Sequence, residues 1–290
     1  MSSAVFSTSA AQGRPFVFES KNEAEVCPQA ELFTEARPPQ RVVSAIFPGA
    51  FQDARLAGVT PASRLAVRPA PEMVSSGIVA MDALTGGLPR GCLTEICGPA
   101  SSGRSTLMLA ALSAATRRGE FCAIVDASDA LDPLSLAAAG IELDRLLWVR
   151  CGENSHQAEH CLEQLLRTTD LLLESGGFGM IVLDLGDLLP QAARRIPLAT
   201  WFRFRRAVEP TSTVLLAVER QSIAGSCSSL LIKLGSMKLG TSENQASPTP
   251  THAQLLTEME ITAELVRSRM DRKPVRSAEI TFASKTAWAG

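Results

Sequence analysis

A glycine-rich turn lies between an apolar run and a helix-like run in the first half of this 290-residue chain. The apolar run covers residues 93–97 and the helix-like run covers residues 107–118. The turn between them consists of Gly98, Pro99, Ala100, Ser101, Ser102, Gly103, Arg104, Ser105 and Thr106. Backbone N–H groups of such a turn, at the start of a helix, form a concavity that favours anions. The layout predicts a phosphate-binding P-loop, with Arg104 where the motif has Lys.

The remaining chain alternates strand-like and helix-like runs. Further strands are predicted at 121–126, 146–150, 180–185, 214–219 and 230–234, and the main helices at 133–140, 156–175 and 198–208. Such alternation implies right-handed crossovers and a mostly parallel, doubly wound sheet of the α/β class. Two more apolar runs, 260–266 and 278–282, predict an antiparallel hairpin at the edge of that sheet.

Composition divides the chain into four parts. Residues 1–71 are rich in Ser, Ala, Pro and Gln, which predicts a disordered or loosely docked arm. We expect the P-loop core at 72–240, a Ser/Thr/Pro-rich linker at 241–254 and a basic hairpin at 255–290.

The overall charge and the cysteines limit the classes of partner and compartment. A formal net charge of −2 gives no global attraction for nucleic acid, so such binding would need local basic patches. The seven cysteines are odd in number and include no Cys-x-x-Cys pair, so a disulfide framework is not expected. No run approaches ~18 apolar residues, and we therefore expect a soluble cytoplasmic protein without a membrane partner.

Two side chains complete the predicted phosphate site. The hydroxyl of Ser105 would contact Mg²⁺, and Asp184 follows an almost entirely apolar strand, where a carboxylate holds Mg²⁺ through water. The alternatives are a chance glycine turn and an ordinary helix-capping aspartate.

Several motifs together resemble the RecA recombinase core over about residues 74–235. The motifs are Ser76-Gly77, Met81-Asp82-Ala83-Leu84, Gly86-Gly87-Leu88-Pro89-Arg90-Gly91, Glu95-Ile96, the P-loop and Ala130-Leu131-Asp132-Pro133. Residues 138–150 and the arginine-rich run 265–272 are more similar to the ImuA branch, RecA-like accessories of bacterial mutagenic translesion synthesis. This resemblance implies ATP and Mg²⁺ as cofactors and a role in the SOS response to DNA damage. It also implies error-prone DNA polymerase machinery or RecA as partners, with single-stranded DNA and a second copy of the chain as further candidates.

The chain departs from the recombinase pattern at its catalytic positions. Ser128 stands where the family has its catalytic Glu, Ser135 where it has an adenine-stacking Tyr, and Arg220 where it has a phosphate-sensing Gln. Losing a general base costs about 10²–10⁴ in rate, and losing a charge stabiliser costs about 10²–10³. We therefore expect weak or vestigial nucleotide binding with little hydrolysis and no confident catalytic residue. The alternative is an ATP-dependent RecA-type recombinase acting on single-stranded DNA.

Two arginine-rich stretches are candidates for contact with DNA or a protein partner. The candidate residues are Arg203, Arg205, Arg206, Arg267, Arg269 and Arg272, and the first stretch also contains Trp201, Phe202 and Phe204. Basic and aromatic side chains together suit single-stranded DNA. The alternatives are an amphipathic helix with buried rings, and an edge hairpin protected from aggregation by charge.

A separate alternative is a zinc-dependent hydrolase. Residues 156–160 fit the His-x-x-Glu-His pattern, which places His156 and His160 on one helix face. A zinc enzyme also needs a third ligand, for which no supporting context is present.

Overall fold

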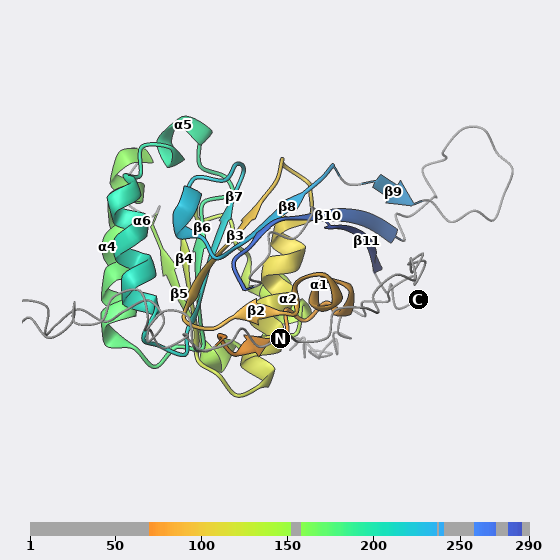
Figure 1. Cartoon of the computed structure of the whole chain (residues 1–290), viewed down its shortest axis with the longest axis horizontal. Coiled ribbons are helices and arrows are strands. Elements are labelled where there is room, and N and C mark those ends of the chain that lie inside the picture. Colours follow the sequence, from red (N-terminus) through yellow and green to blue (C-terminus); the bar gives the residue numbers. More distant parts are fainter. Residues whose placement is uncertain (1–69, 152–157, 237, 241–257, 271–277, 286–290) are drawn as a thin grey trace, which may run out of the picture. The chain divides into compact units, whose positions relative to one another are not determined.

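The computed structural model describes residues 70–151, 158–236, 238–240, 258–270 and 278–285 (Figure 1). Residues 1–69 of the predicted arm, the linker and the tip of the C-terminal hairpin lie outside the described residues. Residues 71–290 fall in one compact unit, and only its described part is considered below.

One sheet contains nearly all the strands. Its order is β11-β10-β8-β3-β7-β6-β4-β5, and β9 pairs with β10. The parallel strands are β3 (Cys92–Cys97), β4 (Cys122–Asp126), β5 (Leu146–Arg150), β6 (Met180–Asp184), β7 (Val214–Glu219) and β8 (Leu230–Leu234). The antiparallel strands are β9 (Lys238–Gly240), β10 (Glu258–Ser268) and β11 (Ala278–Lys285). The structure confirms both the mostly parallel sheet and the C-terminal hairpin.

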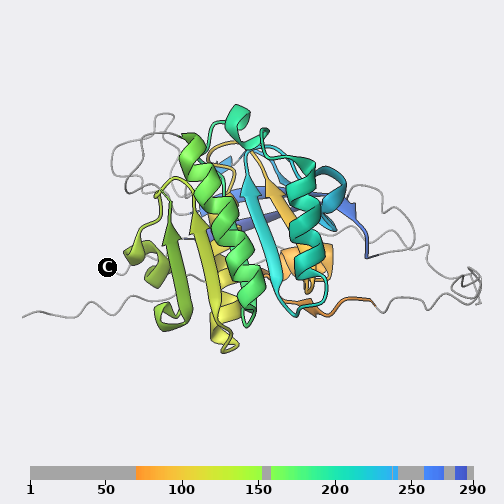
Figure 2. The same cartoon turned by 90° about the vertical axis from the view of Figure 1, so that its left-hand side faces the viewer.

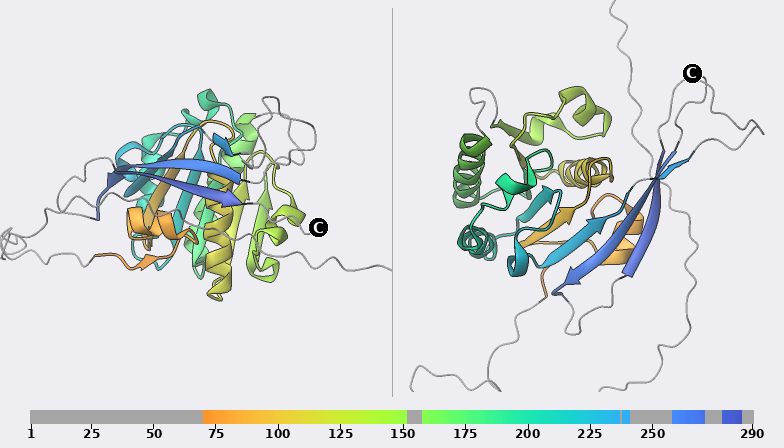
Figure 3. Two further views of the ribbon diagram at one scale, coloured as in Figure 1. Left: turned by 90° about the vertical axis from the view of Figure 1, so that its right-hand side faces the viewer. Right: turned by 90° about the horizontal axis from the view of Figure 1, so that it is seen from above.

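Helices cover both faces of the parallel part of this sheet (Figures 2 and 3). On one face lie α1 (Val79–Thr85), α2 (Arg104–Arg117) and α3 (Pro133–Ala138), and on the other lie α4 (Ala158–Ser175) and α6 (Leu198–Val208). The strands alternate between two apolar clusters, since Ile96 packs on the α2 side and Leu93 on the α6 side. This arrangement is the doubly wound architecture that the sequence predicts.

Smaller elements complete the described fold. A two-stranded ribbon of β1 (Met73–Val74) and β2 (Leu88–Pro89) is separate from the main sheet and was not predicted. Two 3-10 turns, η3 (Leu143–Arg145) and η4 (Gly225–Cys227), precede β5 and β8, and α5 (Pro190–Ala193) follows β6. None of the helices in the described ranges is long and apolar enough to cross a membrane.

The carboxyl ends of the parallel strands bring the predicted site residues to one edge of the sheet. The P-loop follows β3, and Asp126 and Asp184 are register partners at the ends of β4 and β6. Glu219 ends β7 and is the register partner of Cys97, which immediately precedes the P-loop. In open parallel sheets ligands bind at this edge.

Candidate functional site

The backbone of the loop from β3 to α2 forms a tight turn that requires its glycines. Ser101 has φ 57° and Gly103 has φ 90°. A Cβ on Gly98 would lie 2.6 Å from Ser102 Oγ and 2.9 Å from the carbonyl oxygen of Leu234. Ser102 Oγ is buried and has no hydrogen-bond partner among the described residues. The glycines therefore let the backbone of this loop approach a ligand closely, and the Ser102 hydroxyl remains as a donor. Both properties suit a bound anion.

The side chain of Arg104 is bonded to a neighbouring loop rather than free. Arg104 is 8 % exposed, and its Nη1 donates to the carbonyl oxygen of Gly186 at 3.1 Å. The same oxygen accepts a hydrogen bond from Arg220 Nε at 2.9 Å. Burial lowers the pKa of Arg104, while the nearby carboxylates of Asp184 and Asp187 act in the opposite direction. A single carbonyl after β6 thus holds the P-loop arginine and the arginine after β7.

Two aspartates lie side by side beneath this loop. Burial raises the pKa of Asp184 to about 6, and the negative charges of Asp126 and Asp187 add to this effect. Asp184 Oδ1 accepts a hydrogen bond from the Gly186 amide at 2.9 Å. Asp126 is fully buried, and its two oxygens accept from the amides of Ser128 and Leu131 at 3.1 and 3.2 Å. Two adjacent carboxylates with an exposed hydroxyl at Ser105 are oxygen ligands of the kind that Mg²⁺ prefers.

The segment after β4 supplies no carboxylate to this site. Ser128 Oγ is buried without a hydrogen-bond partner among the described residues. The neighbouring Asp129 has φ 55° and forms a bidentate pair with Arg150, at 2.5 Å from Nε and 2.6 Å from Nη2. The carboxylate of Asp129 is therefore engaged by Arg150 of β5.

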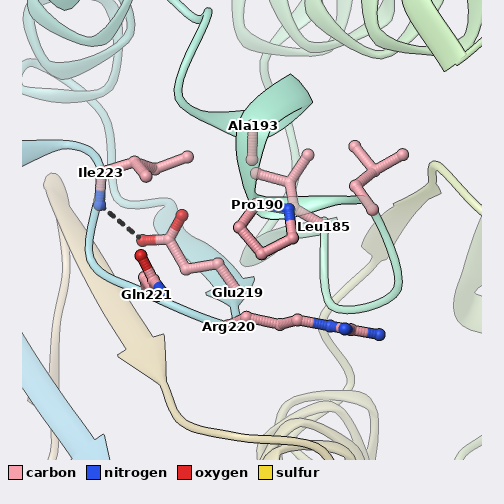
Figure 4. Close-up of a pocket in the computed structure, with 8 residues that line it drawn as sticks. Leu185, Pro190, Ala193, Glu219, Arg220, Gln221 and Ile223 are labelled. Atoms are coloured by element: carbon pink, nitrogen blue, oxygen red, sulfur yellow. Dashed lines mark hydrogen bonds between the residues drawn. The ribbon is translucent and has the colours of Figure 1, made fainter.

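A buried carboxyl pair lies directly behind the P-loop, and sequence reasoning missed it. Glu95 of β3 and Glu219 of β7 are 0 % and 1 % exposed. Glu95 Oε1 accepts from the amides of Ile223 and Ala224 at 2.9 and 2.8 Å and from Ser222 Oγ at 3.1 Å. Glu219 Oε1 accepts from the Ile223 amide at 3.3 Å, drawn in Figure 4. A charged residue inside the apolar run 93–97 was the available signal.

The pKa values of the two carboxyl groups are displaced in opposite directions. Burial raises the pKa of Glu219 well above its usual value, and its hydrogen bond with Glu95 acts in the same direction. Burial alone would raise the pKa of Glu95, but the hydrogen bonds from Glu219 and from the amides of Ala224 and Ile223 outweigh it, so this pKa is lowered. Glu219 is therefore the carboxyl group of the pair that keeps its proton to higher pH, and Glu95 is the one that more readily carries charge, on the amides of the β7–β8 crossover.

A small pocket opens beside this pair (Figure 4). Its walls are mainly apolar, and its lining consists of Leu185, Leu188, Pro190, Ala193, Glu219, Arg220, Gln221 and Ile223. Arg194 donates to Gln221 at its rim. The pocket lies between α5 and the β7–β8 crossover, next to the aspartates rather than within the P-loop.

Two of the predicted contact arginines, Arg203 and Arg267, have partners within the fold. Arg203 pairs with Asp170 of α4 at 2.9 and 2.7 Å, whereas Arg267 donates to the carbonyl oxygen of Gly225 and, at 3.0 Å, to Ser228 Oγ. Trp201 and Phe204 are fully buried, which confirms the amphipathic-helix reading for those two rings. Arg272 lies outside the described residues.

The zinc alternative finds no support in the part of the chain that the structure describes. His156 lies outside that part, and His160 Nε2 lies 3.2 Å from Gln164 Nε2 on the same helix. No group of three His, Cys, Asp or Glu side chains in the described ranges could hold a metal ion.

Comparisons with known proteins agree with the geometry of the P-loop region. Residues 64–194 match the family of the RecA N-terminal domain. This segment is RecA-like. Protein RecA of Ectopseudomonas oleovorans is 40% identical over 124 residues, which cover 42% of this chain and 33% of that protein. Protein RecA of Nitrobacter winogradskyi is 30% identical over 165 residues, covering 51% of this chain and 43% of that protein.

The RecA-like segment is only part of the proteins it matches. The chain spans about a third to two fifths of the length of these curated relatives. A solved structure, that of the RadB recombinase, aligns with 71% of this chain and 94% of its own, at 18% identity and a TM-score of 0.49.

Proposed function

We propose that this chain is a RecA-like accessory protein of the bacterial DNA-damage response, whose P-loop holds a nucleotide phosphate but supports little hydrolysis. The observation that carries the proposal is the hydrogen bond from Arg104 to Gly186. It engages the P-loop cation with the β6–α5 loop, while the backbone turn that would hold the phosphate is intact.

The residues that would hold ATP and Mg²⁺ follow from this geometry. The amides of residues 98–106 would bind the phosphates, and Ser105 and Asp184 would hold the metal ion. When bound, Mg²⁺ would neutralise negative charge on the phosphates. Ser128 would leave the attacking water without a carboxylate to orient it, so turnover would be slow.

The accessory role rests on the resemblance of residues 138–150 and 265–272 to the ImuA branch. In this role the chain would support mutagenic translesion synthesis through contacts with an error-prone polymerase or with RecA. A core that binds nucleotide but turns it over slowly suits a protein that works through stable contacts rather than through cycles of hydrolysis.

The test compares nucleotide binding and hydrolysis, with and without single-stranded DNA, for the wild type and three variants. These are Arg104→Lys, Ser128→Glu and the double variant. We expect the wild type to bind a fluorescent ATP analogue without DNA-stimulated turnover, and the double variant to hydrolyse ATP faster than either single variant. Brisk DNA-stimulated hydrolysis by the wild type would refute the proposal.

A true recombinase is the second candidate, favoured by the 40% identity to Protein RecA over 124 residues. It requires strand exchange between homologous DNA molecules in the presence of ATP. The same preparation can be assayed for that activity, and a positive result would replace the accessory role.

A further inference from the structure

Arginines of α6 and arginines at the end of β10 are far apart in the sequence and lie near η4. Arg267 of β10 donates to Gly225 and Ser228, and the amide of Arg269, two residues later, donates to the carbonyl oxygen of Ser229 at 2.9 Å. From the other side, Leu198 of α6 lies 3.6 Å from the position that a Cβ would take on Gly225. The start of η4 therefore lies between α6 and the end of β10.

Arg205 reaches the same place. Burial raises the pKa of the Cys227 thiol in η4, and the guanidinium groups of Arg205 and Arg269 both act in the opposite direction. Arg205 lies seven residues after Leu198 and Arg206 four residues after Phe202, so these four side chains share one flank of α6. We call this surface the η4 face, and it comprises Leu198, Phe202, Arg205, Arg206, Val266, Arg267 and Arg269.

The η4 face exposes apolar side chains between its arginines. Leu198 and Phe202 are one helical turn apart on α6 and are 54 % and 49 % exposed. Val266 of β10 is 44 % exposed. A register shift falls between Leu265 and Arg267, so Val266 is the extra residue of a bulge and stands beside Arg267, whose side chain donates to the η4 segment. In the view from above, α4 and α6 lie over the parallel strands rather than over β10 and β11 (Figure 3).

The positive charge of this face is not compensated within the described residues. Arg203, on the opposite flank of α6, pairs with Asp170, and Arg167 of α4 pairs with Glu163. In the described ranges, by contrast, Arg205, Arg206 and Arg269 form no ion pair with a carboxylate. The cations beside the exposed apolar side chains are therefore available to a negatively charged partner.

The kind of side chain on this face favours a protein over single-stranded nucleic acid. Nucleic-acid surfaces of this type stack several bases on aromatic rings. Trp201 and Phe204 are fully buried, so α6 offers only Phe202 for stacking. The neighbouring exposed groups, Leu198 and Val266, are aliphatic and suit the apolar side chains of a peptide.

We propose that the η4 face docks an acidic amphipathic segment of a partner protein, with apolar side chains on Leu198, Phe202 and Val266. Carboxylates of that segment would pair with Arg205, Arg206 and Arg269, since the planar guanidinium matches a carboxylate bidentately. The inference deepens the proposed accessory role by assigning the surface and the chemistry of its protein contact. It requires no nucleotide, so its failure and the failure of the P-loop proposal are distinguishable.

The test selects peptides from a phage-displayed library of random sequences against the full chain, without nucleotide. The chain carrying Arg205→Glu and Arg269→Glu serves for counter-selection. We expect selected peptides to be acidic, with apolar residues three and four positions apart. Their affinity should fall at least about tenfold for the double variant and for Phe202→Ser.

A matched control separates a specific site from general electrostatics. Arg167→Glu with Arg117→Glu, on α4 and α2, makes the same change in charge at exposed positions away from the η4 face, and it should leave binding nearly unchanged. Circular dichroism and thermal unfolding verify that each variant is folded. The proposal is overturned if no acidic peptide is selected or if the control weakens binding equally. It is also overturned if a thymidine oligonucleotide, and not the peptides, shows the dependence on Arg205 and Arg269.

Discussion

Replacing Glu219 by Gln should stabilise this protein at alkaline pH and have much less effect at acidic pH. In the folded chain Glu219 holds the proton of the buried pair, whereas in the unfolded chain it ionises near 4.5. Between 4.5 and its raised pKa the folded state therefore carries one proton more than the unfolded state. The stability that protonated Glu219 contributes is fully present below the pKa it has in the unfolded chain. It is lost as the pH rises through the pKa it has in the folded chain. A Gln side chain can still donate to Glu95 and cannot ionise.

The magnitude follows from that single proton. One proton of difference changes the unfolding equilibrium by up to about tenfold for each pH unit. Glu95 has the opposite dependence, because its lowered pKa gives stability that is present above 4.5 and lost as the pH falls further. Glu95→Gln should weaken charge-assisted hydrogen bonds from Ile223 and Ala224, at about 1.5–3 kcal/mol for a bond to a charged group.

Urea unfolding of the full chain at pH 5.5, 7 and 8.5 measures both effects. The stability of Glu219→Gln relative to the wild type should increase along this series. Glu174→Gln, an exposed change on α4, should show no such trend. If the difference between Glu219→Gln and the wild type is the same at all three values, Glu219 does not hold the proton and the reasoning is wrong.

Two further predictions concern the P-loop. Ile261 of β10 is fully buried, and its Cδ1 lies 2.5 Å from the position of a Cβ on Gly103. In urea unfolding, Ile261→Ala should lower the free energy of unfolding by about 2–5 kcal/mol, and Ile261→Val should lower it by about 0.5–1.5 kcal/mol. An equal cost for both would contradict tight packing at this point. Asp184→Asn removes a carboxyl group whose pKa is raised to about 6, so without Mg²⁺ it should stabilise the chain above pH 6 and not below pH 4. It should also weaken the Mg²⁺ dependence of nucleotide binding, measured by titration; an unchanged dependence would exclude Asp184 as a ligand.

The features that could be predicted from sequence are those set by local pattern. Apolar runs between glycines and polar turns indicate buried parallel strands, and the helix at residues 198–208 was predicted with the bounds that α6 has. Asp132 caps α3 by accepting from the Ser135 amide at 2.8 Å, a relation between residues three apart. Parallel strand order then brings Asp184 to the P-loop edge without further information.

The features that could not be predicted depend on register and on long side chains. The contacts of Arg267 and Arg269 beside η4 require that Arg267 pair with Leu231, and a bulge between Leu265 and Arg267 changes that register. The pairing of Glu95 with Glu219 requires β3 and β7 to be neighbours in a given register. Each of these two contacts joins residues that are far apart in the chain, so no short stretch of the sequence contains both partners.

The hydrogen bonds at Gly186 change how the departures from the recombinase pattern should be interpreted. Arg104 and Arg220 stand at two separate positions of that pattern, yet both donate to one carbonyl oxygen. A carbonyl oxygen has two lone pairs, so both donors are accommodated and the β6–α5 loop is tied to α2 and to the end of β7.

After Arg104→Lys, the bond from Arg220 still holds Gly186. Adding Arg220→Gln to Arg104→Lys and Ser128→Glu should therefore restore hydrolysis further, and the triple variant should exceed the double variant in turnover. Equal turnover would mean that the two arginines act independently.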